Sequence, residues 1–178
     1  QMTAMLRVAL RLGADLDSVF NHINNQLVED LPEEHFITAF LGILDTRQHE
    51  ATFHSGGQGP LLHYRANTGE FRWMAPSTYP LGFVAYPTVK PAEVVAFEPG
   101  DILGLISDGV YEYGDAQGKQ FGMEGVEQVV RNHHDRPMSE LLEALVGEAR
   151  RFAGDMPQQD DVTLVLLRRM TDGVEAAA

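Results

Sequence analysis

The chain has 178 residues, of which 44% are hydrophobic and 22% charged, a composition typical of one globular domain and not of a disordered or fibrous protein. Its 26 acidic side chains outnumber 13 Lys plus Arg, giving a formal net charge of −13 that disfavours nucleic acids and anionic membranes as partners. The absence of cysteine excludes disulfides, thiolate metal sites and thiol catalysis. No apolar run approaches the ~20 residues that cross a bilayer.

Two amphipathic helices are predicted at the start of the chain. Residues 2–12 carry apolar side chains at three- and four-residue steps, and Gly13 is suited to end a helix. Asp15 can cap a second helix over residues 16–31, which Pro32 terminates. Because the chain opens inside the first helical pattern, we expect an upstream portion. Nothing resembles a signal peptide, so a cytoplasmic location is expected.

From residue 36 the pattern changes to short runs rich in β-branched and aromatic residues, separated by turn signals such as ANTG and EPGD. These runs predict strands, mainly in antiparallel sheets, with two helices before the last strand. Ser139 or Asp135 lies near the start of the second of these helices, and Gly154 at its end. The strands are expected over residues 36–45, 50–54, 60–65, 70–74, 93–97, 101–107 and 161–169, and the helices over 123–134 and 138–154.

The order of these elements indicates an α+β layered domain. ILGLI and VTLVLL scarcely alternate between apolar and polar residues, so both faces of these two strands are expected to be covered. The domain is expected over residues 1–170, and residues 171–178 form a flexible tail.

Carboxylates stand at the ends of these two apolar strands. Asp108 follows ILGLIS, while Asp160 and Asp161 lead into VTLVLL. Successive residues of a strand face opposite sides, so at most one of the pair points the same way as Asp108. If the strands are neighbours, the carboxylates converge and stay ionised only around a cation, for which Mg²⁺ or Mn²⁺ is suited. The alternative is an Asp-Gly turn and a solvated loop.

Other residues carry weaker signals. Ser107 lacks the G-x-S-x-G turn of a serine hydrolase. Gly56, Gly57 and Gly59 lack the Lys-Ser/Thr ending of a phosphate-binding loop, so a tight β-turn is favoured, with His54 and His63 flanking a hairpin. The histidines do not assemble into ligand spacing, and Glu112 is either near the site or a solvated loop residue.

The segments EPGDILGLISDGVYEYGD and QQDDVTLVLLRR resemble, in order, the SDG and Asp-Asp-x-Thr motifs of bacterial serine/threonine phosphatases of the SpoIIE and RsbU type, within the PP2C-like superfamily. FITAFLGILD, ATFHSGGQGPLLHYR and YPLGF are collinear with further segments of that family. The resemblance spans residues 1–168. The family's earlier Gly-Asp segment, which supplies an aspartate that bridges two metals, has no counterpart here.

The resemblance implies a β-sandwich of mainly antiparallel sheets flanked by helices, of which this chain forms the last three quarters. It implies that Asp108 and Asp160 ligate Mn²⁺ or Mg²⁺, with two ions in the complete domain, and that catalysis proceeds through metal-bound water. The role of Asp161 is left open. The implied substrate is a phosphorylated regulatory protein such as an anti-sigma-factor antagonist, with an upstream receiver or sensor domain as regulator.

Two hypotheses follow. In the first, the complete domain is a metal-dependent phosphoprotein phosphatase, and this chain alone is nearly inactive. In the second, the chain is a catalytically inactive, phosphatase-like binding or adaptor module of a response-regulator system. Whether it forms a homodimer is left open.

Overall fold

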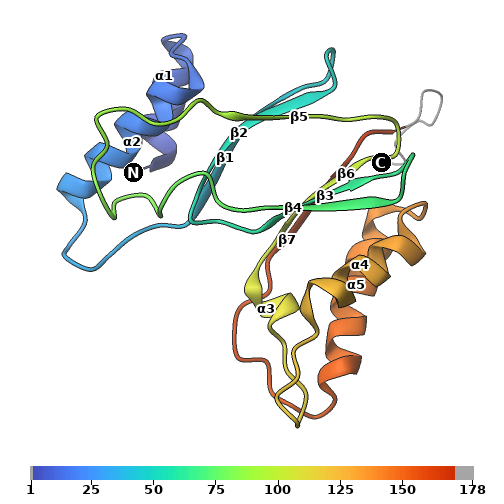
Figure 1. The fold of residues 1–178 in the computed structure, drawn as a ribbon. Helices are drawn as coiled ribbons and strands as arrows, with labels where there is room; N and C mark the ends of the chain where they lie inside the picture. The colour runs from blue at the N-terminus through green and yellow to red at the C-terminus, as the bar shows by residue number, and fades with distance from the viewer. Residues whose placement is uncertain (1, 171–178) are drawn as a thin grey trace. The chain divides into compact units, whose positions relative to one another are not determined.

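The computed structural model describes residues 2–170, and the predicted tail lies outside them. Within this range helices and strands follow one another in the predicted order, with one short helix added after the sixth strand (Figure 1). The helices are α1 Met2–Arg11, α2 Leu16–Asp30, α3 Asp108–Tyr111, α4 Gly122–His133 and α5 Met138–Ala153. The strands are β1 Ala39–Asp45, β2 Glu50–Gly56, β3 Leu61–Arg65, β4 Glu70–Met74, β5 Glu93–Ala96, β6 Ile102–Ile106 and β7 Leu164–Arg168.

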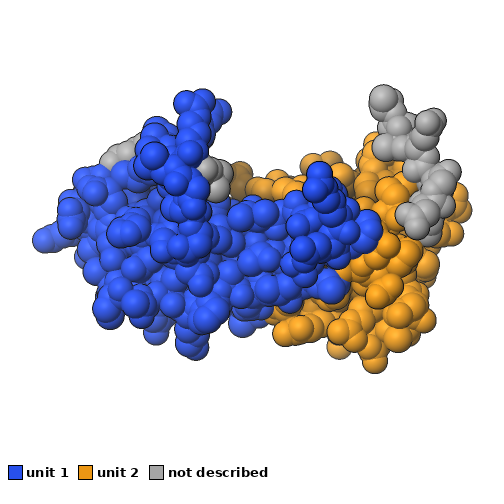
Figure 2. Space-filling view, turned by 90° about the horizontal axis from the view of Figure 1, so that it is seen from above, with its two compact units in different colours: residues 1–58, 75–96 blue, residues 59–74, 97–178 orange. Residues whose placement is uncertain are grey.

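The chain divides into two compact units that alternate along the sequence (Figure 2). Unit 1 comprises Gln1–Gln58 and Ala75–Ala96, and unit 2 comprises Gly59–Met74 and Phe97–Ala178. Each unit combines helices with one antiparallel sheet, so the predicted α+β class is confirmed at this level. None of the helices described between residues 2 and 170 has the length and apolarity needed to span a membrane.

Unit 1 contains α1, α2 and a sheet in the order β1-β2-β5. Asp15 caps α2 as predicted, because its carboxylate accepts the backbone N–H of Ser18 at 2.9 Å. The apolar side of α2 is buried together with Ala39 and Leu81. Its buried apolar side chains are Leu16, Val19, Phe20, Ile23 and Leu27.

Asparagines on α2 hold the long irregular segment between β4 and β5. Asn24, fully buried, donates to the carbonyl of Val84 at 2.9 Å and accepts the N–H of Gly82 at 3.1 Å. Asn25 exchanges two hydrogen bonds with the backbone of Tyr86, at 2.8 and 3.0 Å. These bonds satisfy backbone groups that have no sheet partner, which is why the segment is ordered without being a strand.

Unit 2 contains a sheet in the order β4-β3-β6-β7, packed against α4 and α5 through one apolar core. β6 lies between β3 and β7, and all its residues except Leu105 are buried. The prediction that both faces of ILGLI are covered is therefore confirmed. The core includes Leu62, Ile102, Ile106, Val126, Val130, Leu141 and Leu145.

β7 differs from this expectation. It pairs with β6 alone and is the last strand of the sheet within the described chain, and Val165 is 45% exposed. The prediction that VTLVLL is covered on both faces is therefore wrong. An outer strand has fewer neighbours, and its apolar residues do not reveal that position.

One smaller expectation also fails. β2 pairs with β1 and β5 whereas β3 pairs with β4 and β6, so residues 56–60 connect two sheets and do not form the predicted hairpin turn. α5 begins at Met138 with Ser139 near its start, as predicted, and it has Pro137 at its N-cap and no side-chain cap. A proline in this position stops the helix from extending further toward its N-terminus.

β6 and β7 are antiparallel neighbours, and Ile106 lies opposite Leu164. The residues that follow β6 and those that precede β7 are therefore at the same end of the sheet. From the sequence, convergence of the carboxylates was expected only if the two strands were neighbours. The sheet order shows that they are neighbours.

A buried histidine lies in the middle of β3. His63 is 4% exposed, and its Nε2 is 3.7 Å from Oδ2 of Asp101, too long for a hydrogen bond. Asp101 instead accepts the backbone N–H groups of Ala66 and Glu98, at 2.8 and 2.9 Å. Burial lowers the pKa of His63 below its ordinary value of 6.5, against the opposing effect of Asp101.

We predict that this histidine makes the fold less stable in mild acid. A depressed pKa means that the unfolded chain binds the proton more tightly, so stability falls as pH drops from 6.5 toward the folded-state pKa. Urea unfolding at pH 7.5 and pH 5.5 should show a smaller loss of stability for His63→Gln than for the unchanged chain. An equal loss in both proteins would contradict the assignment, because the other histidines are common to both.

Candidate active site

Asp108 is the first residue of α3, a single helical turn that follows β6 directly. Its carboxylate is exposed, and Oδ1 accepts the N–H of Gly109 at 3.0 Å. Ile106, two residues earlier, is fully buried. The predicted position at the end of a buried strand is therefore confirmed, although the helical turn was not predicted.

Ser107 joins the end of β6 to the approach to β7. Its hydroxyl donates to the carbonyl of Asp161 at 3.0 Å and accepts the N–H of Thr163 at 2.8 Å. Its own N–H donates to the carbonyl of Thr163 at 2.9 Å. The hydroxyl is thus committed to holding the backbone, which agrees with the rejection of a serine nucleophile.

Gly109 lies directly against the same backbone. A Cβ at this position would be 2.4 Å from the carbonyl oxygen of Asp161 and 2.9 Å from that of Asp160. No side chain fits there without displacing the 160–161 segment. The glycine of the SDG motif is therefore required for close approach of two backbones.

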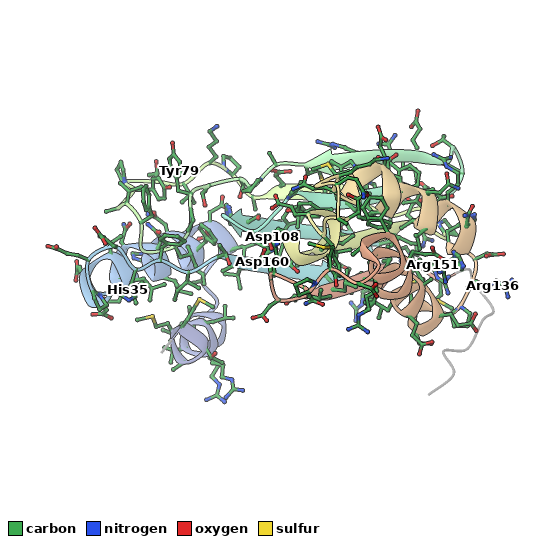
Figure 3. The ribbon with its side chains drawn as sticks, turned by 90° about the horizontal axis from the view of Figure 1, so that it is seen from below. His35, Tyr79, Asp108, Arg136, Arg151 and Asp160 are labelled. Atoms are coloured by element: carbon green, nitrogen blue, oxygen red, sulfur yellow. The ribbon has the colours of Figure 1, made fainter. Side chains whose placement is uncertain are left out.

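These contacts bring two predicted ligand residues together. Figure 3 shows Asp108 and Asp160 beside each other, as expected from the approach of Gly109 to residue 160. Both carboxylates are exposed, and Asp161 is exposed next to them. Residues 160–163 are not part of a strand, so alternation does not decide which of the two aspartates faces Asp108.

A small hollow adjoins the aspartates. It is lined by Glu112 and Tyr113 on one side and by Pro157, Gln159 and Asp160 on the other. Tyr113 donates its hydroxyl to the carbonyl of Met156 at 2.8 Å, and Gln158 donates its amide to the carbonyl of Asp160 at 2.7 Å. Glu112 therefore belongs to the surroundings of the site, one of the two alternatives that the sequence left open.

Tyr111 is a further neighbour that the sequence did not single out. Burial raises the pKa of its phenol, and the negative charges of Asp108 and Glu112 raise it further. The phenol therefore stays protonated at neutral pH, and it can donate a hydrogen bond but not act as a base. The sequence could have indicated this neighbour, because a Tyr three residues after an Asp lies next to it if the segment forms a helical turn.

The donor set fits a hard cation in kind, because Asp108, Asp160 and Asp161 offer carboxylate oxygens and no softer ligand. Oδ1 of Asp108 accepts a backbone N–H, and its second oxygen has no hydrogen-bond partner among residues 2–170. Among residues 2–170 no three His, Cys, Asp or Glu side chains form a group that could hold a metal ion. The described chain thus supplies a small set, to be completed by water or other donors.

The histidines take structural roles. His54 is buried, stacks on Phe20 with centroids 4.5 Å apart, and bonds to Asp17 through Nε2 at 2.8 Å. His133 Nδ1 is 3.0 Å from the carbonyl of Val129.

A larger hollow of about 610 Å³ in unit 1, lined in part by Tyr79, Tyr86 and Lys90, contains none of the predicted ligand residues.

Comparison with known proteins identifies the family and the fold. The family described as "Stage II sporulation protein E (SpoIIE)" matches residues 1–170. The SiaA-PP2C domain of Pseudomonas aeruginosa is 21% identical with a TM-score of 0.73, covering 95% of this chain and 66% of that one. No curated protein sequence matches the chain at a significant level.

Two longer structures are similar to the same extent. The phosphatase domain with a fragment of the regulatory domain of SpoIIE from Bacillus subtilis is 22% identical with a TM-score of 0.74, covering 94% of this chain and 48% of that one. The structure of the RsbU and RsbW domains of a Mycobacterium tuberculosis protein is 21% identical with a TM-score of 0.75, covering 96% of this chain and 46% of that one. The chain thus spans from 46% to 66% of these three structures. At such identities the likeness establishes the fold, and the expected PP2C-like class is confirmed.

We predict that Ser107→Ala lowers stability by about 1–2 kcal/mol, because two backbone groups lose their shared partner. Ser107→Thr keeps the hydroxyl and should therefore retain most of the stability, so the pair of variants separates the hydrogen bonds from other effects. Urea unfolding measures both. Equal stability of Ser107→Ala and the unchanged chain would show that the hydroxyl does not hold residues 161 and 163.

Gly109→Ala should be more disruptive, costing about 1–3 kcal/mol of stability or displacing the 160–161 backbone, since the added methyl has no space. Gly147→Ala is the matched control: it lies in α5 with open space around its Cβ and should stabilise by about 0.5–1 kcal/mol. Thermal unfolding and amide NMR shifts of residues 158–163 report both effects. Unchanged shifts and stability in Gly109→Ala would refute the close approach.

Proposed function

Because the chain belongs to the SpoIIE family and its pairing of β6 with β7 joins the SDG and Asp-Asp segments, we propose that it forms part of a protein phosphatase acting in regulatory signalling. The proposed reaction is hydrolysis of a phosphoserine or phosphothreonine ester, dependent on Mn²⁺ or Mg²⁺. The observation that carries the proposal is the approach of Gly109 to residues 160–161, which seats Asp108 and Asp160 together.

In this proposal Asp108 and Asp160 are the ligands of the cation. Asp161, which is exposed next to Asp160, is a candidate additional ligand. When bound, the cation offsets phosphate charge and lowers the pKa of a water molecule. Ser107 and Gly109 hold the backbone segments that carry the two carboxylates close together, which reduces the reorganisation needed on binding. The protonated phenol of Tyr111 lies nearby and donates a long hydrogen bond to the carbonyl of Gly59 at 3.5 Å.

We further propose a phosphorylated regulatory protein as substrate, of the anti-sigma-factor antagonist class, with an upstream receiver or sensor domain as regulator. Support comes from the similar structure that contains both RsbU and RsbW domains, and from the one that contains a regulatory-domain fragment. The net charge of −13 disfavours nucleic acids as alternative substrates. Homodimerisation remains a separate hypothesis.

The second candidate is an adaptor without catalysis. It is favoured by the small donor set, since Mg²⁺ gives up its water reluctantly and two carboxylates hold it weakly. The same argument leads to the expectation that this chain alone turns over phosphate esters slowly. Catalysis and mere binding are distinguished by combining a metal titration with an activity assay.

We predict that Asp108→Asn and Asp160→Asn each weaken Mn²⁺ binding by at least about tenfold, because a carboxylate ligand becomes a neutral amide. Isothermal titration calorimetry measures the affinity, and a phosphopeptide assay measures the hydrolysis that should fall in parallel. Asp135→Asn is the control, since this exposed aspartate lies in the same unit after α4, outside the site.

The outcomes separate the hypotheses. Loss of both Mn²⁺ binding and hydrolysis in the two site variants, with Asp135→Asn unchanged, supports the phosphatase. Because this chain alone is expected to be slow, hydrolysis is compared in the complete domain; there, Mn²⁺ binding that depends on both aspartates without any hydrolysis supports the adaptor. Unaltered Mn²⁺ affinity in both site variants would eliminate the proposed ligands.

A further inference from the structure

Three arginines surround an open hollow in unit 2, which we call the arginine hollow. Arg65 and Arg72 come from β3 and β4, and Arg131 comes from the last turn of α4. The hollow measures about 450 Å³, and its remaining lining residues are Gly69, Glu70, Phe71 and Glu127. Such a gathering of guanidinium groups is unexpected in a chain with only 13 Lys plus Arg against 26 acidic residues.

Two of these arginines lack a carboxylate partner in the part of the chain that the structure describes. Glu127 is engaged by the indole N–H of Trp73 at 2.8 Å. Glu70 lies 3.7 Å from Arg65, and both side chains are more than half exposed, so this ion pair is weak and easily exchanged. Arg72 and Arg131 therefore have no ion-pair partner among the described residues, and the three guanidinium groups of the hollow outnumber its two carboxylates, Glu70 and Glu127.

Arg131 is held in place before any ligand arrives. Its guanidinium lies 4.9 Å from the centre of the Phe71 ring, and Nη1 is 3.4 Å from the carbonyl of Gly69. Phe71 in turn packs against the buried ring of Tyr64, with centroids 4.9 Å apart. A guanidinium fixed over an aromatic ring loses less conformational freedom on binding, which favours affinity.

The hollow is separate from the candidate active site. In the register of β3 with β6, Leu61 lies opposite Leu105 and Tyr64 opposite Ile102. Asp108 follows the Leu61 end of this pair, whereas Arg65 and the β3–β4 turn follow the Tyr64 end. A five-residue strand is about 17 Å long, so one small ligand cannot reach both places.

We propose that the arginine hollow is a docking site for an acidic segment of a protein partner. Guanidinium groups bind carboxylates and phosphates in bidentate fashion, and the aromatic floor accommodates an apolar side chain beside the acidic ones. A volume of about 450 Å³ is larger than a single inorganic anion needs. The charge of the whole chain repels such a segment elsewhere, which directs it to this hollow. This proposal does not depend on the phosphatase function.

The chain has a single tryptophan, and Trp73 is hydrogen-bonded to Glu127 of the hollow, so its fluorescence is a local probe. We would titrate the whole chain with a short Asp/Glu-rich peptide, the same peptide carrying phosphoserine, a neutral Asn/Gln version, and inorganic phosphate. Binding of the two acidic peptides should weaken with added salt. Arg72→Gln and Arg131→Gln should each weaken it about tenfold.

Arg136→Gln is the matched control, because Arg136 is exposed in the same unit outside the hollow (Figure 3). The side chain of Arg72 makes no hydrogen bond or ion pair within residues 2–170, so its replacement tests binding while the β3–β4 backbone pairing is kept. Acidic-peptide binding that persists in both hollow variants, or is lost equally in Arg136→Gln, would overturn the proposal. So would equal binding of the neutral peptide, or binding of inorganic phosphate as tight as that of the peptides.

Discussion

The carbonyl oxygens of Asp160 and Asp161 lie where a side chain on residue 109 would have to be, and the candidate site depends on this absence of space. Gly109 permits the contact, and the hydroxyl of Ser107 fixes it by bonding residues 161 and 163 at once. The aspartate between them is thereby aimed from a backbone that is held on both sides. In the motif Ser-Asp-Gly, the serine and the glycine position the backbone, and the aspartate between them carries the charge.

The core of unit 2 holds the strand that precedes this arrangement in place. β6 is buried between β3 and β7 and covered by α4 and α5, so the end of β6 is a fixed reference for residues 107–111. The 154–163 connection has little regular structure and is held by Tyr113, Gln158 and Ser107 instead. The charged groups are therefore exposed at this edge while the backbone that carries them is held by hydrogen bonds.

The same sheet carries different chemistry at its two ends. The end formed by the exit from β6 and the entry to β7 gathers carboxylates, whereas the β3–β4 turn with the end of α4 gathers guanidinium groups. The two groups of opposite charge are thereby kept at opposite ends of one sheet. The proposed cation site and the proposed docking site are therefore separate and do not neutralise each other.

The sequence by itself determined the identity and order of the elements, because amphipathic spacing, turn residues and the Asp15 cap act locally. It also determined the candidate ligands Asp108 and Asp160, through the motifs that resemble the phosphatase family. It did not determine that β6 and β7 are neighbours, that VTLVLL is an outer strand, or that residues 56–60 link two sheets. Strand pairing is decided by long-range packing, and equally apolar strands can be ordered in several ways. Only the tertiary structure therefore joined the aspartates, inserted α3, and assembled the arginine hollow from segments some 60 residues apart.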